Sequence, residues 1–225
     1  MPYGEHHPLV GYPIRSDEEM IARARGFADE MRTRRTVRSY APRQIAEAVV
    51  RSCLEVALSA PNGANRQPWH FVAITDPGLK RQIREAAEEE ERRFYGGGAP
   101  QEWLDALAPL GTDADKPFLE EAPLLVAIFA ESYELRPDGT RVKNYYVQES
   151  VGIATGMLIT AFHHAGLATL THTPSPMRFL NDLLGRPYHE RPFLLLVVGH
   201  PAQDATVPAI TKKPFASVVT FARGS

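Results

Sequence analysis

The sequence predicts a single domain of mixed helices and strands, in which helices cover a buried sheet on both faces. The chain has 225 residues, of which 44% are hydrophobic, and this is enough for one sizeable core. Two continuous apolar runs, residues 124–130 and 193–198, have the composition of strands that are covered on both sides. Residues 146–165 are apolar nearly all round, which is typical of a helix buried on every side, in the core or at a subunit interface.

Signals at segment ends place the other elements. Ser16 and Glu19 form a capping box, so a helix should begin near Asp17. Apolar spacing, turn residues and β-branched residues predict three further elements in the N-terminal half. They are a helix over residues 43–58 ending at a turn over 60–63, a strand over 69–75, and a charged helix that opens at Asp76 and carries Glu91 and Tyr95.

Residues 95–119 do not have the pattern of a rigid core element. Three consecutive glycines and a proline open the segment, whereas Trp103 and Leu107 are apolar and need something to cover. A mobile lid that orders over a ligand has both properties. We place this lid at about residues 92–118 and an extended N-terminal arm at residues 1–15.

Glu91, Tyr95 and Lys116 form a candidate ligand site beside this lid. Glu91 and Tyr95 are four residues apart, so they share one face of the predicted helix, and Lys116 follows the glycine-rich stretch. A carboxylate can take the α-ammonium of an amino acid, a lysine can take its α-carboxylate, and a tyrosine hydroxyl can serve either group. The alternative is a solvated helix face, because acidic runs on helices mostly face water.

A basic cluster and an amide-rich turn form a second candidate site. Residues 34–38 read RRTVR, which places three guanidinium groups suited to phosphate at the end of the first helix. Taken alone, the cluster also fits a solvated basic end that complements a helix C-terminus. Residues 60–69 read APNGANRQPW, and a turn with amide side chains and exposed backbone donors can approach a flat polar ring closely.

Composition argues against several other classes of function. The 25 basic and 27 acidic residues nearly balance, so we predict neither a nucleic-acid surface nor a membrane surface. No secretion signal or membrane-spanning run is evident, and we expect a cytoplasmic protein. The single cysteine, Cys53, lies on an apolar stripe and reads as a core thiol, with a catalytic thiol as the alternative. His6 and His7 are assigned no metal, and no metal site is predicted.

The order of these motifs resembles the nitroreductase superfamily. RRTVR at 34–38 followed by APNGANRQPWHF at 60–71 is similar to its FMN-binding signature. The iodotyrosine deiodinase branch matches further, through EEEERRFY at 88–95, Lys116, TLTHTP at 169–174, LGRP at 184–187, and DATVP at 204–208 followed by KP at 213–214. The resemblance covers nearly the whole chain from about residue 16. It implies an α+β fold, a nitroreductase-like FMN-binding domain over residues 1–225 with a central, mostly antiparallel sheet flanked by helices, and a domain-swapped homodimer.

The resemblance also implies FMN as the cofactor and assigns the residues that hold it. The residues matched to the phosphate and ribityl chain are Arg34, Arg35, Thr36, Arg38 and Lys212. The residues matched to the flavin ring are Pro61, Asn62, Gly63 and Asn65, contributed across the dimer, and Thr171 and Thr173, of which Thr173 meets flavin N5. The branch has serine at Asn62, histidine at Asn65 and arginine at Lys212; asparagine still donates and accepts, so we expect binding to survive. His172, between two inward threonines, should point away from the site.

For the substrate, the resemblance matches Glu91, Tyr95 and Lys116 to a clamp for a zwitterion, and Ala64 to the residue whose N–H meets a phenolate. It implies FMN-dependent reductive dehalogenation of iodo-, bromo- or chlorotyrosine, with Thr173 and Ala64 as catalytic residues. The expected electron donor is NAD(P)H, directly or through a reductase. Two alternatives remain: a general NAD(P)H-dependent nitroreductase or quinone reductase, which has no need of the clamp, and a flavin-binding or flavin-consuming protein.

Overall fold

The computed structural model describes residues 4–222, which divide into two units, residues 4–34 and residues 35–222. Each unit is described by itself. The predicted N-terminal arm belongs to the first unit, and residues 4–15 contain no helix or strand; the first three residues of the arm lie outside the described part.

Helix α1 (Asp17–Arg32) ends the first unit and begins where the capping box predicts. The Ser16 hydroxyl accepts a hydrogen bond from the backbone N–H of Glu19 at 3.2 Å. Acidic residues fill the first turn, where the helix dipole favours negative charge. Local sequence signals are therefore sufficient to define the start of this helix.

The second unit is built on a four-stranded sheet with the order β1-β2-β6-β5, in which every neighbouring pair is antiparallel. The strands are β1 (Trp69–Ile74), β2 (Leu124–Glu131), β5 (Ala168–His172) and β6 (Glu190–Gly199). The α+β fold with an antiparallel sheet is confirmed, as are both continuous apolar strands. A separate hairpin pairs β3 (Tyr133–Leu135) with β4 (Arg141–Lys143).

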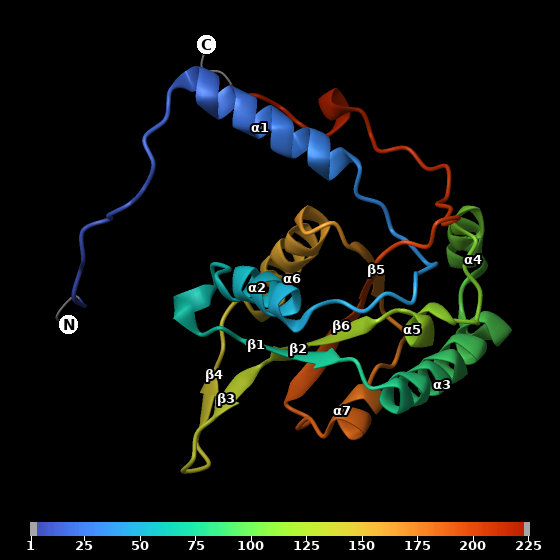
Figure 1. Cartoon of the computed structure of the whole chain (residues 1–225). Coiled ribbons are helices and arrows are strands. Elements are labelled where there is room, and N and C mark those ends of the chain that lie inside the picture. The colour runs from blue at the N-terminus through green and yellow to red at the C-terminus, as the bar shows by residue number, and fades with distance from the viewer. Residues whose placement is uncertain (1–3, 223–225) are drawn as a thin grey trace. The chain divides into compact units, whose positions relative to one another are not determined.

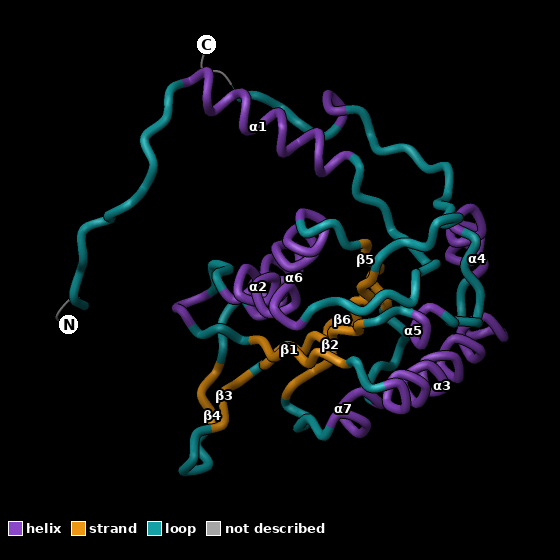
Figure 2. Tube along the Cα trace, viewed as in Figure 1, coloured by secondary structure: helices purple, strands orange, loops and turns teal. Residues whose placement is uncertain are grey.

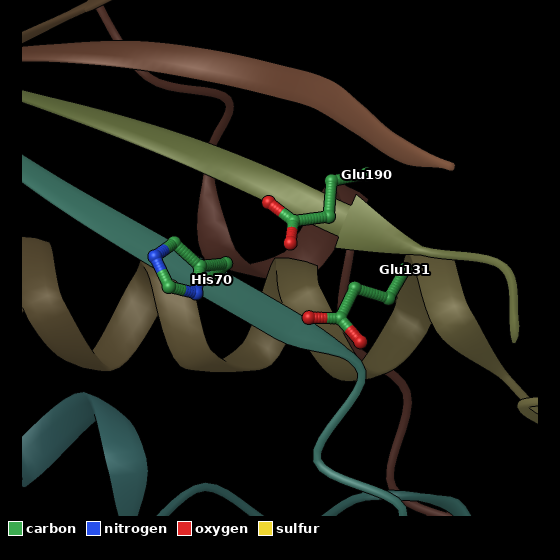
Figure 3. A group of neighbouring side chains, drawn as sticks. All are labelled: His70, Glu131 and Glu190. Carbon is green, nitrogen blue, oxygen red and sulfur yellow. The ribbon is translucent and has the colours of Figure 1, made fainter. Parts of the chain in front are cut away.

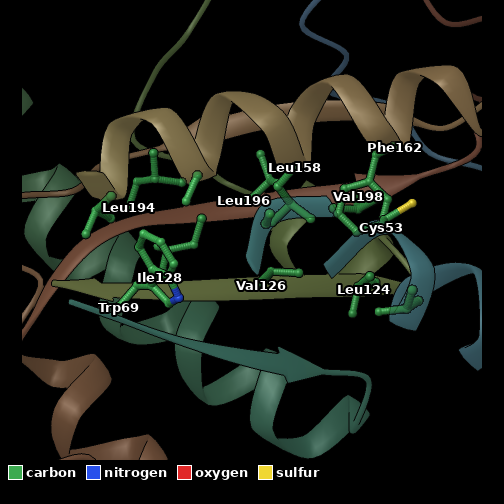
Figure 4. Packing of buried hydrophobic residues seen from close by; sticks show 14 of the residues in the cluster. Cys53, Trp69, Leu124, Val126, Ile128, Leu158, Phe162, Leu194, Leu196 and Val198 are labelled. Carbon is green, nitrogen blue, oxygen red and sulfur yellow. The ribbon is translucent and has the colours of Figure 1, made fainter. Parts of the chain in front are cut away.

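Helices cover both faces of this sheet, as Figure 1 shows. The covering helices are α2 (Glu47–Leu58) and α6 (Val147–His164) on one face, and α3 (Pro77–Arg93), α5 (Phe118–Glu121) and α7 (Phe179–Leu184) on the other. Alternate residues of β2 serve the two cores: Val126 and Ile128 face α2 and α6 (Figure 4), whereas Leu125 and Ala127 face α3 and α5. A strand buried on both faces has no polar position, which explains the continuous apolar run.

Helix α2 begins four residues later than predicted, at Glu47 rather than residue 43. Its N-cap, Ala46, has extended backbone angles and no side-chain acceptor for the first turn. The extended segment before it carries Ile45 onto the core, and this packing replaces the predicted first turn. Cys53 of α2 is buried in the same core and burial raises the pKa of its thiol, in agreement with a core thiol.

Helix α6 confirms the predicted span but not the prediction of burial on every side within one chain. Val151, Leu158 and Phe162 are fully buried against the sheet. Ile153 on another side of the helix is 44% exposed, and Gly156 is also exposed. The remaining possibility that the sequence analysis named, a subunit interface, stays a prediction.

The predicted lid contains short helical pieces joined by loops, visible around α4 in Figure 2. They are the π-helical turn Phe94–Gly98, α4 (Gln101–Leu107) and the 3-10 turn Ala108–Leu110, and none contains a buried residue. Few buried apolar contacts hold such a segment, as expected for a lid. Among residues 4–222, no helix is long and apolar enough to cross a membrane.

Candidate functional site

A cavity of about 250 Å³ lies between the end of α3, the lid and the end of β5. Six of the predicted site residues line it: Arg38, Glu91, Tyr95, Lys116, Thr171 and Thr173. They come from four separated parts of the sequence. The fold of the second unit therefore brings the predicted clamp and the predicted threonines to one place.

Glu91 and Lys116 face each other across the wall of this cavity. The Lys116 ammonium lies 3.4 Å from a carboxylate oxygen of Glu91, and both side chains are largely buried, with 3% and 14% exposure respectively. The same ammonium donates to the Thr112 hydroxyl at 3.1 Å and to the Asp113 carbonyl. The predicted clamp residues thus form an ion pair with each other, which sequence spacing did not predict.

Tyr95 completes the clamp wall. Its hydroxyl donates to the Thr112 carbonyl at 3.3 Å, and the Lys116 ammonium lies 5.5 Å from the centre of its ring. Burial raises the pKa of the Tyr95 hydroxyl, so it is a neutral donor near pH 7. Burial also raises the pKa of Glu91, and the Lys116 charge offsets part of this effect. The wall therefore presents one carboxyl group, one amino group and one neutral hydroxyl.

Lys116 is also fixed through its backbone. Its N–H donates to the carboxylate of Glu88 at 2.7 Å, and the same carboxylate oxygen accepts from Arg84 at 2.7 Å. Arg84 and Glu88 both belong to α3, so the C-terminal end of the lid is bonded to a core helix. This arrangement holds the lysine in place while the middle of the lid has few contacts.

The end of β5 also lines the cavity. Thr171 and Thr173 are exposed on one face of the strand, and His172 between them is buried on the other face, with 7% exposure. The alternation is as predicted, but His172 nevertheless lines the cavity, because β5 ends at this residue and the chain bends at residues 175–176. Strand alternation alone could not predict this. The His172 ring stands edge-on to Phe118, with ring centres 5.8 Å apart.

His172 is neutral in this environment. Burial lowers the pKa of the imidazole to about 3, assisted by the positive charges of Lys116 and Arg38. Among the described residues, its Nε2 atom is buried without a hydrogen-bond partner. The site therefore contains an uncharged imidazole whose protonation is opposed by burial and by two positive charges.

Part of the predicted phosphate-binding segment lies along the edge of the sheet beside β5. Thr36 forms an isolated parallel bridge with Thr169, and the Val37 N–H donates to the Thr169 carbonyl at 3.3 Å. Arg38 follows and borders a second cavity of about 440 Å³ as well as the first. The second cavity is also lined by residues 109–111 of the lid and by parts of the DATVP motif at 204–208.

The other basic residues are less closely placed. Arg35 donates to the Pro208 carbonyl, which ties this edge to the C-terminal segment. Arg34 is the last residue of the first unit, and Lys212 is exposed and lines neither cavity. Only Arg38 of the predicted phosphate set therefore borders both cavities.

The predicted flavin loop lies away from both cavities. Pro61, Asn62, Gly63, Ala64 and Asn65 follow α2, and in Figure 1 this turn lies at the opposite end of the sheet from α3 and α4. One chain does not bring these residues to the clamp. Their predicted contribution across a dimer stays a prediction.

The loop nevertheless has the backbone of a functional segment. Ala64, Asn65 and Gln67 have φ angles of 52°, 53° and 47°, in the left-handed region that side chains disfavour. The Asn62 carboxamide oxygen accepts from the Gln67 N–H at 2.8 Å and so braces the turn. A Cβ on Gly63 would lie 2.7 Å from the Tyr145 carbonyl, so only glycine fits there. Strain held by such contacts clusters at binding sites.

Sequence reasoning missed several residues of the cavity wall. Phe94 and Trp103 pack edge to face with ring centres 5.1 Å apart, and both line the cavity. Apolar residues in a polar, glycine-rich segment were the available signal, and they indicated a lid without indicating which residues face the ligand. Glu90 also lines the cavity, but its carboxylate accepts from Arg93 at 3.0 Å.

Comparisons with known proteins identify the family of this chain. The family model for the nitroreductase family matches residues 31–200. The chain is 52% identical over 202 residues to an iodotyrosine deiodinase of Haliscomenobacter hydrossis, covering 90% of this chain and 91% of that protein. It is 36% identical over 222 residues to human iodotyrosine deiodinase 1, covering 97% and 74%. A crystal structure of oxidized iodotyrosine deiodinase bound to FMN and 3-iodo-L-tyrosine aligns with a TM-score of 0.73 at 32% identity, covering 87% of this chain and all of that one.

Proposed function

The chain belongs to the iodotyrosine deiodinase branch of the nitroreductase family, and from this premise we propose that it is an FMN-dependent oxidoreductase that removes halogen from iodo-, bromo- and chlorotyrosine. The observation that carries the proposal is the buried Glu91–Lys116 pair in the wall of a cavity that also contains Thr171 and Thr173. A generic flavin reductase has no need for two opposite charges at this position.

The charge pair selects a zwitterionic ligand. An amino acid that enters between the two side chains replaces one ion pair with two, since Glu91 takes its ammonium and Lys116 its carboxylate. A ligand with one charge or none would separate the pair and leave a buried charge without a partner, which is costly. Tyr95 adds a neutral hydroxyl for either charged group.

The residues beside the cavity fit FMN. Arg35 and Arg38 form no ion pair with any carboxylate of residues 35–222, so their guanidinium groups retain donors for a phosphate. The Thr171 and Thr173 side chains are exposed on the cavity side of β5, where they can donate to a polar ring edge. When bound, FMN supplies the two electrons that reductive cleavage needs. We propose that NAD(P)H provides these electrons, directly or through a reductase.

The overall reaction takes halotyrosine, two electrons and one proton to tyrosine and halide. The carbon–halogen bond breaks, the ring carbon gains the proton, and the halide leaves with an electron pair. Protein residues orient the ring by holding its amino-acid end at Glu91 and Lys116. We propose that the N–H of Ala64 of the partner subunit stabilises the phenolate, and that Thr173 donates to flavin N5. The lid excludes water and so strengthens these polar contacts.

A ligand series tests this proposal. FMN-loaded protein is titrated with 3-iodotyrosine, with 2-iodophenol and with a nitroarene, and flavin fluorescence reports binding. Iodotyrosine should bind about tenfold or more tightly than iodophenol, because only iodotyrosine pairs with both charges of the clamp. Equal affinity for iodophenol, together with efficient nitroarene reduction, would instead support a general nitroreductase.

A further inference from the structure

A second group of chemically active side chains lies outside the cavity, at the ends of three strands. It consists of His70 of β1, Glu131 of β2 and Glu190 of β6, and one ligand atom from each residue lies within 4.8 Å of the others. Figure 3 shows the two carboxylates and the imidazole turned toward one another. Glu190 is buried, and His70 and Glu131 are partly buried. None of the three lines either cavity described above.

A β-bulge brings the two carboxylates together. The register between β2 and β6 shifts at Phe193, so that Glu131 is directly opposite Glu190. Residues directly opposite each other in a sheet share a face, and like charges in such a pair are destabilising. Without the bulge, Glu190 would lie on the same face as Leu194, with α2 and α6. The strand geometry therefore creates an unfavourable pair that needs a positive charge.

The protein supplies only part of the positive charge that the Glu131–Glu190 pair needs. Arg186 binds both oxygens of Glu190, one of them at 2.7 Å. Within residues 4–222, neither the Glu131 carboxylate nor the His70 imidazole forms a hydrogen bond; the bond from Asn144 goes to the backbone carbonyl of Glu131. Each oxygen of Glu190 keeps further acceptor capacity. Arg186 is thus positioned to orient one carboxylate, as outer residues do at metal sites.

We propose that His70, Glu131 and Glu190 bind one divalent first-row metal ion of the zinc type. One imidazole and two carboxylates are a donor set suited to such ions. Donors at about 2.1 Å from one tetrahedral ion are about 3.4 Å apart, so these ligand atoms, which lie within 4.8 Å of one another, need to approach by at most about 1.4 Å. The ion would join β1, β2 and β6 and neutralise the Glu131–Glu190 pair.

Zinc binding to the full chain tests the site. Protein stripped of metal with a chelator is titrated with ZnCl2 by calorimetry, and its melting temperature is measured with and without Zn²⁺. The parent should bind one ion per chain and melt at a higher temperature with Zn²⁺, because the ion binds the folded state. Glu131→Gln and His70→Gln should each abolish both effects.

Matched variants separate this site from adventitious binding. The double variant His6→Ala, His7→Ala removes the two adjacent histidines of the N-terminal arm and should bind Zn²⁺ like the parent. Without metal, Glu131→Gln should melt at or above the parent's temperature, because it relieves the like-charge pair; lost binding then does not reflect unfolding. Absence of stoichiometric uptake, uptake lost with His6 and His7, or undiminished uptake by Glu131→Gln would each overturn the proposal.

Discussion

At the scale of single residues, the clamp depends on a charge pair that is complete without ligand. Lys116 is buried and Glu91 nearly so, and each is the other's counter-charge. A zwitterion can replace this pair without leaving a buried charge, whereas the pair excludes apolar ligands of the same size. We therefore propose that selectivity for a zwitterionic ligand originates in the Glu91–Lys116 pair.

Glu91→Gln should weaken halotyrosine binding by about 1.5–3 kcal/mol, the range for losing a hydrogen bond to a charged group. FMN affinity should hardly change. Glu90→Gln is the matched control, because Glu90 lines the same cavity but pairs with Arg93. Titrations with iodotyrosine across pH provide the measurement. The folded-state pKa of Glu91 is raised, so binding should decline as pH falls through that raised pKa, and this decline should be missing in Glu91→Gln.

His172 makes stability depend on pH. Its pKa is about 3 in the folded chain and near 6.5 when unfolded, so the unfolded chain binds a proton that the folded chain does not. This imidazole should therefore cost stability as pH falls below 6.5, by about 2 kcal/mol between pH 7.5 and pH 5. Urea unfolding at the two pH values should show a smaller loss for His172→Gln than for the parent or for the exposed-site control His7→Gln. Identical losses in all three proteins would contradict a buried neutral His172.

The grouping of the clamp residues around one cavity was predictable from the sequence, whereas their role in binding stays a prediction. The Glu91–Tyr95 spacing and the position of Lys116 indicated a zwitterion site, and the fold places all three around one cavity. Sequence could not show that Glu91 and Lys116 pair with each other, because that contact depends on the path by which residues 94–115 bring Lys116 back against α3. It also could not place His172, because alternation fails as a guide where a strand ends.

At the scale of elements, the predicted lid is anchored at both ends beside the clamp residues, and its middle part is open to solvent. Its start belongs to the end of α3, its end is bonded to Glu88 through the Lys116 N–H, and the part between lacks buried residues. Trp103 touches Phe94 in the cavity wall yet is 56% exposed. A ligand in the cavity would give this indole a surface to cover.

Trp103→Ala should loosen the lid and weaken halotyrosine binding by about 1 kcal/mol, the scale of one lost aromatic pair. Limited proteolysis checks the physical reason: halotyrosine should slow cleavage within residues 95–118 of the parent, and the variant should be cleaved faster. Leu135→Ala is the control, because Leu135 is exposed on the separate hairpin. It should change neither the cleavage rate nor the affinity for halotyrosine. A cleavage rate that halotyrosine does not alter would argue against closure of this segment.

Element boundaries followed from sequence where capping or burial leaves a clear signal. Ser16 and Glu19 define the start of α1, and burial on both faces makes β2 and the end of β6 continuous apolar runs. The bulge at Phe193 has no such signal, because it depends on pairing between strands distant in sequence. The late start of α2 has the same kind of cause, since Ile45 packs on the core instead of extending the helix.

At the scale of the whole molecule, we propose that a second copy of the chain completes the site. The strained loop at Ala64 and the clamp at Glu91 lie at different ends of one sheet. Ile153 on α6 is a large apolar side chain that is 44% exposed in one chain and that a partner subunit would cover. Both observations favour the predicted homodimer with sites shared between subunits.

Light scattering should give twice the chain mass of 25.0 kDa for the FMN-loaded protein. Ile153→Asp should dissociate the dimer and release FMN, because each flavin would lose the loop of the partner subunit. Leu135→Asp, at a similarly exposed apolar position on the hairpin (51% against 44% for Ile153), should leave mass and FMN content unchanged. A monomer that retains full FMN would refute the shared site.

The stoichiometry of a single turnover tests the central claim most directly. FMN-loaded protein is reduced without oxygen, mixed with 3-iodotyrosine, and analysed for iodide and tyrosine. We predict one iodide and one tyrosine for each two-electron-reduced FMN, with little product in Glu91→Gln at the same substrate concentration. Oxidation of the reduced protein by a nitroarene, with no iodide released from iodotyrosine, would contradict the account.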